Sequence, residues 1–116
     1  MRFQILDEAG CIACPFATSR TRIVADEVGD NYKSGGVMVI GEAPGYTEDK
    51  LGRPFVGESG KVLDQFLSLA GLTRDMLYIT NAVRCRPPKN KTPTKKQVDF
   101  HRIFVAQAIA TASPRL

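Results

Sequence analysis

Apolar residues are concentrated in two short runs, each of the length of a β-strand. The run VMVI at residues 37–40 is too short for a helix and is bounded by glycines on both sides. The run MLYITNAV at residues 76–83 is rich in β-branched and aromatic residues, which favour strands. The pattern therefore predicts two buried strands separated by about 35 residues, enough for a crossover helix.

Two helices are predicted around the second strand. Between the runs, apolar residues recur at the spacing of one helix face, at Val62, Leu63, Phe66, Leu67 and Ala70. Gly71 then stands where such a helix would end. A last helix is predicted to follow Pro93 and to run through about Thr111, because Thr94 and Gln97 have the spacing of a capping box.

A strand, a crossover helix and a second strand form a right-handed unit whose strands are parallel. Both strands then end at one edge of the sheet, where ligands bind in open α/β folds, so Glu42 and Asn81 are expected to face one crevice. The predicted fold class is α/β, a three-layer αβα arrangement with a parallel sheet that is truncated after its second core strand. Residues 1–116 are predicted to form a single incomplete domain.

Two parallel strands alone cannot make a well-covered sheet, because parallel sheets are normally larger and buried on both faces. The sequence leaves three explanations open. The chain is a fragment, its fold is completed by a partner chain, or it is a degenerate protein that has lost catalysis.

Charge adds one feature to this picture. The net charge of +4 is mild, but residues 84–96, RCRPPKNKTPTKK, hold six basic residues and no acidic one. A positive loop or rim is predicted there, either as a solvated loop or as a contact to nucleic acid. The first residues, MRFQILDEAG, lack the pattern of a signal peptide, and no apolar run is long enough to cross a bilayer, so a cytoplasmic protein with reduced cysteines is expected.

Two glycine-containing segments suggest phosphate binding at first sight. GESGK at residues 57–61 is not a phosphate-binding loop, because Phe55 stands where its first glycine should be and Val62 where Ser or Thr should follow. GEAPG at residues 41–45 lacks the order of a dinucleotide site. Its glycines let the backbone approach a ligand closely, and Gly41 is expected to contact the substrate. Glu42 would act beside that ligand as a charge or a base.

The cysteines form an odd set of three. Cys11 and Cys14 make a C-x-x-C pair, and Cys85 lies far along the chain. In a cytoplasmic protein such a pair is a redox couple, a metal clip or accidental. Together with His101, the only histidine, the three cysteines would complete four ligands for zinc or an iron–sulfur cluster.

The ordered motifs resemble the iron–sulfur uracil-DNA glycosylases, family 4 and its relatives. The resemblance is carried by CIACPF, GEAPGYTEDKLGRPFVGESGKVLDQFL and LYITNAVRCRPPKNKTPT, with the helix that follows. It runs through nearly the whole chain but covers only about the first half of that family's domain. The half that is not matched supplies further strands and a late loop with a histidine that stabilises the leaving uracil.

The resemblance implies a pocket for a uracil flipped out of DNA, and hydrolysis of the N-glycosidic bond of deoxyuridine in base excision repair. Glu42 would lie near the water that attacks the sugar C1′, Phe55 would stack on the uracil ring, and Asn81 would hydrogen-bond its Watson–Crick edge. A [4Fe–4S] cluster would be held by Cys11, Cys14 and Cys85, and His101 stands where the family has its fourth cysteine.

Simpler interpretations of these residues stay open. Phe55 could be a core residue, Asn81 a strand-end turn residue and Glu42 a loop cap. Zinc could replace the cluster. The alternative function is a non-catalytic, metal-stabilised nucleic-acid-binding or interaction module derived from the same family.

Overall fold

The computed structural model describes residues 20–114. Its elements, in chain order, are β1 (Glu27–Val28), β2 (Val37–Gly41), α2 (Tyr46–Leu51), α3 (Glu58–Ala70), the 3₁₀ turn η1 (Arg74–Met76), β3 (Leu77–Asn81), the 3₁₀ turn η2 (Pro88–Asn90) and α4 (Lys95–Ala112). The protein is thus a small α/β structure. No helix within the described residues has the length and apolar character needed to cross a membrane.

The sheet has three strands in the order β1-β3-β2. β2 and β3 are parallel, as predicted, and their register places Gly41 opposite Asn81 at the carboxyl edge. β1 was not predicted, and it pairs with β3 in the antiparallel direction, so the sheet is mixed and the expectation of a purely parallel sheet was wrong. A strand of two residues has no periodicity from which it could be recognised in the sequence.

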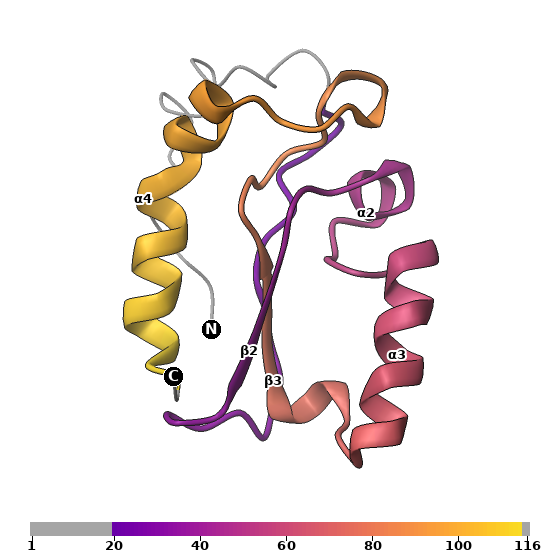
Figure 1. The fold of residues 1–116 in the computed structure, drawn as a ribbon, viewed down its shortest axis with the longest axis vertical. Coiled ribbons are helices and arrows are strands. Elements are labelled where there is room, and N and C mark those ends of the chain that lie inside the picture. Colours follow the sequence, from indigo (N-terminus) through magenta and orange to yellow (C-terminus); the bar gives the residue numbers. More distant parts are fainter. Residues whose placement is uncertain (1–19, 115–116) are drawn as a thin grey trace.

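Helices lie on both sides of the sheet, with α4 on one side and α2 and α3 on the other (Figure 1). Side chains alternate along the fully buried strand β3. Leu77 and Ile79 pack with Leu67 of α3, whereas Tyr78 packs with Ala108 and Ala112 of α4. The central strand therefore contributes to two apolar clusters, one on each face.

The predicted helix boundaries are confirmed where local signals mark them. α3 ends at Ala70, and Gly71 caps it with a left-handed backbone at φ 73°. α4 begins after Thr94, whose side chain accepts a hydrogen bond from the Gln97 backbone amide, while the Gln97 side chain accepts one from the Thr94 backbone amide. Both ends follow from the capping chemistry of the residues involved.

The predicted buried face of α3 was partly wrong. Leu63 and Leu67 pack against the sheet, but Val62 and Phe66 are 50% and 64% exposed and Ala70 is also exposed. Apolar spacing identified the helix correctly without showing which of two adjacent faces meets β3. The choice is made by tertiary packing, which the helical period alone does not encode.

A buried polar cluster joins β3 to the segment before β1. The Asp26 carboxylate accepts hydrogen bonds from Tyr78 Oη at 2.6 Å and Thr80 Oγ1 at 2.5 Å, and it forms an ion pair with Arg84. Arg84 also donates to the carbonyl of Phe104 in α4. Arg84 was predicted to belong to a positive rim, but its side chain is 1% exposed, so that part of the prediction was wrong.

Candidate functional site

The site lies where β2 and β3 end. Backbone pairing continues past the strands, because the Ala82 amide donates to the Gly41 carbonyl and the Val83 amide donates to that of Glu42. The two segments that leave the sheet are therefore held side by side. This is the carboxyl edge at which the sequence predicted a crevice.

The four predicted substrate-site residues, Gly41, Glu42, Phe55 and Asn81, line a single cavity of about 240 Å³, together with Ala43, Glu48 and Ser59. Pockets for drug-sized ligands measure about 300–1,000 Å³, so this cavity has the scale of one small ring system. The structure thus brings together side chains from two strand ends and from the loop between α2 and α3.

Asn81 is 5% exposed, and its side chain reaches over Gly41. Within the described part of the chain its amide has no hydrogen-bond partner, although it faces the cavity. An amide that faces a cavity can both donate and accept a hydrogen bond there.

Gly41 makes room for both recognition groups. A Cβ atom at this position would lie 2.6 Å from Cζ of Phe55 and would also overlap the Asn81 side chain. Only a residue without a side chain lets the ring of Phe55 and the amide of Asn81 meet over the end of β2. The absence of a side chain at Gly41 is thus a steric requirement of the cavity.

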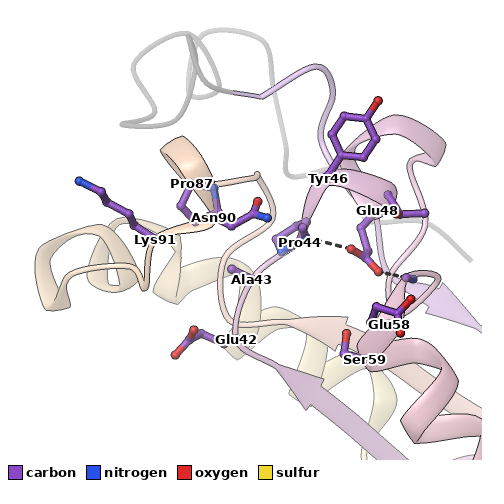
Figure 2. A pocket seen from close by; sticks show the side chains of 13 residues that line it. Glu42, Ala43, Pro44, Tyr46, Glu48, Glu58, Ser59, Pro87, Asn90 and Lys91 are labelled. Carbon is purple, nitrogen blue, oxygen red and sulfur yellow. Dashed lines mark hydrogen bonds between the residues drawn. The ribbon is translucent and has the colours of Figure 1, made fainter.

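Glu42 is exposed at the mouth of the cavity. Figure 2 shows its carboxylate turned away from Glu48 and Ser59. A carboxylate in this place is open to solvent. That position suits a group that orients or deprotonates water.

Glu48 is a second acid at the cavity, and the sequence analysis did not single it out. It lies in the short helix α2, which was not predicted, and it is 6% exposed. Its carboxylate accepts hydrogen bonds from the amides of Gly45, Val56 and Gly57 at 3.0, 2.9 and 2.6 Å, two of which are dashed in Figure 2. The Gly45-x-x-Glu48 capping spacing was the available sequence signal.

A second hollow of about 340 Å³ adjoins the cavity and shares Glu42, Ala43, Glu48 and Ser59 with it. Pro87, Asn90 and Lys91 form its other wall (Figure 2). The exposed ring of Tyr46 lies at this hollow, with the guanidinium of Arg86 5.3 Å from its centre. Part of the basic segment therefore reaches the candidate site.

The predicted metal ligands are divided between two parts of the chain. Cys11 and Cys14 lie outside the described residues. Within residues 20–114, no group of three or more His, Cys, Asp or Glu side chains forms a metal site. Cys85 and His101 are both 2% exposed, and Cys85 packs with Val83 beside Ala43 of the site loop.

The chemistry of these two donors fits a metal centre. Burial lowers the pKa of His101 to about 4, helped by the charges of Arg84 and Arg20, so the imidazole is neutral at neutral pH and has the protonation state of a ligand. Arg20 donates a hydrogen bond to Cys85 Sγ at 3.3 Å. A metal held here would brace the Ala43 loop beside the cavity.

The chain is similar to known proteins of one superfamily. The model of the uracil DNA glycosylase superfamily matches residues 29–116. The type-4 uracil-DNA glycosylase of Thermotoga maritima is 45% identical over 104 residues, which cover 90% of this chain and 53% of that protein. The corresponding protein of Pyrobaculum aerophilum is 42% identical, with 90% and 52% covered.

A more distant relative is the type-5 uracil-DNA glycosylase of Thermus thermophilus, 40% identical over 76 residues that cover 53% of this chain and 34% of that protein. The chain spans about half the length of the type-4 relatives it matches. The match to the family model extends over most of the sequence and includes both strand ends that form the cavity. The chain belongs to the uracil DNA glycosylase superfamily.

Proposed function

We propose that this chain carries the uracil-binding half of a DNA glycosylase, which hydrolyses the N-glycosidic bond of deoxyuridine in DNA. The observation that carries the proposal is the single cavity lined by Gly41, Glu42, Phe55 and Asn81. An aromatic ring, an amide that faces the cavity and a carboxylate at its mouth are groups that can stack on an extruded base, hydrogen-bond it and promote hydrolysis of its glycosidic bond.

Recognition is assigned to Phe55 and Asn81. Stacking on Phe55 would offset part of the cost of extruding the nucleotide, which is a few kcal/mol. The Asn81 amide both donates and accepts, so it pairs with adjacent N3–H and O4 groups of uracil. Cytosine presents an acceptor and an amine at these positions, which reverses the pattern and leaves buried groups unpaired.

Chemistry is assigned to Glu42. As the bond between the base and C1′ breaks, positive charge develops on the sugar, and a carboxylate stabilises that charge. The same group orients a water molecule and accepts its proton as the oxygen bonds to C1′. Uracil leaves with the bonding electron pair, and the DNA keeps a sugar without a base.

The DNA strand is proposed to run along the second hollow. Lys91 and Arg86 supply positive charge for the backbone, and the exposed ring of Tyr46 offers a face to a neighbouring base. A partner chain or further sequence would complete the binding surface. The prediction of a cytoplasmic protein stays a prediction.

A [4Fe–4S] cluster is proposed to be held by Cys11, Cys14, Cys85 and His101, with zinc as the alternative metal. When bound, such a centre would supply structural support by fixing the segment after β3 against the site loop. The protein residues carry the reaction. Cys85 and His101 support the proposal by their burial and by the neutral form of the imidazole.

Release of uracil from a labelled single-stranded oligonucleotide tests the function. We expect Glu42→Ala to lower the single-turnover rate by about 100-fold, the lower range for loss of a general base. Asp30→Ala is the matched control, because Asp30 is an exposed acid that lines neither hollow. Equal rates for wild type and Glu42→Ala would remove Glu42 from the reaction. DNA binding that weakens with salt, without any uracil release, would favour the non-catalytic module instead.

A further inference from the structure

Phe55 has an unusual backbone. Its φ is 54°, in the left-handed region that favours glycine, although it carries a large side chain. Its ring nevertheless points over Gly41 into the cavity. A residue keeps such a strained conformation only where its surroundings over-determine it, and strain of this kind gathers at functional sites. The atoms that hold this backbone therefore decide where the ring lies.

Arg74 binds the backbone carbonyl groups of Phe55 and of the residue before it. Its Nη2 donates to the Pro54 carbonyl and its Nη1 to the Phe55 carbonyl, each at 2.9 Å. Its planar fork spans the two acceptors, a geometry that an ammonium group cannot copy. The guanidinium is itself oriented by two carboxylates, Asp64 at 3.2 Å and Glu27 at 3.4 Å.

Glu48 holds the amide groups on the other side. Its Oε2 accepts from the amides of Val56 and Gly57, the two residues that follow Phe55. Its Oε1 accepts from Gly45, at the end of the GEAPG loop (Figure 2). Every polar backbone group it binds thus belongs to one of the two loops that line the cavity. The first turn of α3 closes against the same backbone, since a Cβ at Gly60 would overlap the Phe55 carbonyl.

We propose that Arg74 and Glu48 form a clamp that fixes the backbone of residues 54–57 and so places the Phe55 ring in the cavity. Arg74 does not line the cavity, so it is a positioning residue that acts through Phe55. The assignment of a base as the occupant rests on the proposed function. The clamp itself rests on the hydrogen bonds around Phe55.

Fluorescence tests the clamp without requiring activity. The sequence contains no tryptophan, so Phe55→Trp introduces a single reporter at the position in question. Removing the fork by Arg74→Ala in this background is expected to shift the emission by at least 5 nm, because the indole leaves its fixed environment. The apparent affinity for free uracil, measured by quenching of the tryptophan emission, is expected to fall at least tenfold.

Arg53→Ala is the matched control. Arg53 forms an ion pair with Glu27 at 2.7 Å, as Arg74 does, but it has no hydrogen bond to the Pro54 or Phe55 carbonyl among the described residues. We expect its emission and quenching to match the parent Phe55→Trp protein. Arg74→Lys keeps the positive charge beside Glu27 and Asp64 but loses the fork, so it should resemble Arg74→Ala and serves if the alanine variant fails to fold.

In the protein that keeps Phe55, Arg74→Lys is expected to lower the single-turnover rate of uracil release at least tenfold. Its affinity for DNA is expected to stay within twofold of that of wild type. Emission and quenching that are the same in Phe55→Trp with and without Arg74→Lys would overturn the clamp, even if wild type releases uracil. If wild type releases no uracil and free uracil does not quench Phe55→Trp, the proposed function fails. The difference in tryptophan emission between Arg74→Lys and Arg53→Ala, both in the Phe55→Trp protein, then still tests whether the clamp exists.

Discussion

Gly41 lies directly opposite Asn81 in the parallel pairing of β2 and β3, and the Asn81 side chain extends across the space where a Cβ of residue 41 would be. The register of two strands thus places a recognition amide above a residue with no side chain. The ring of Phe55 occupies the same space from the other side. A cavity with an amide and an aromatic wall follows directly from this pairing.

Gly41→Ala is predicted to close this space. The new methyl group would displace the Phe55 ring or the Asn81 amide, at a cost of about 1–3 kcal/mol for overpacking. We expect uracil release to fall at least tenfold, while circular dichroism shows an intact fold and a lower melting temperature. Full activity in Gly41→Ala would show that neither side chain needs its present position.

The pair of Asp26 and Arg84 is predicted to be essential to stability. Both side chains are 1% exposed, so Asp26→Asn would leave the guanidinium without its counter-charge. Breaking one partner of a buried pair costs about 3–5 kcal/mol, which should appear as a lower urea midpoint. The double variant Asp26→Asn/Arg84→Met should recover part of that loss. A double variant less stable than Asp26→Asn would contradict this account of the pair.

Lys91 is predicted to contact the DNA backbone through the hollow beside the cavity. Lys91→Ala should weaken binding to any single-stranded oligonucleotide and reduce the slope of log affinity against log salt by about 1. Lys33→Ala is the control, because Lys33 is exposed before the amino end of β2, away from the site edge. Equal slopes for wild type and Lys91→Ala would place the strand elsewhere.

Metal content tests the ligand set. We expect protein purified without oxygen to be brown and to contain iron, and Cys85→Ser to lose both the colour and part of the thermal stability. His101→Cys should retain more iron than wild type under air, because it completes four thiolates. Bound zinc in a colourless protein would favour zinc, and protein without any metal would contradict the proposed centre.

Local signals in the sequence were sufficient for much of the fold. The runs around Val39 and Ile79, the glycine after Ala70 and the capping box at Thr94 each act within a few residues, and the strands and helices they predicted are present. The shared edge for Glu42 and Asn81 followed from the handedness of the crossover. Topology thus supplied one of the long-range contacts on which the site depends.

Other features depend on contacts that no local pattern encodes. Arg74 is 19 residues from the Phe55 carbonyl that it binds, and Asp26 is 54 residues from Thr80. Arg84 belongs to the same basic segment as the cations that follow it in the sequence. It is nevertheless buried, where it forms an ion pair with Asp26. Such pairings are visible only when the chain is folded.

The central claim is that the amide of Asn81, which faces the cavity, hydrogen-bonds a uracil base there. It is tested most directly by single-turnover release of uracil from a single-stranded oligonucleotide, comparing wild type, Asn81→Ala and the control Asn31→Ala. Asn31 hydrogen-bonds Asp75 and does not line the cavity. The account predicts a loss of about 100-fold for Asn81→Ala, equivalent to about 3 kcal/mol, and no loss for Asn31→Ala. Release by wild type and Asn81→Ala at the same rate would contradict it.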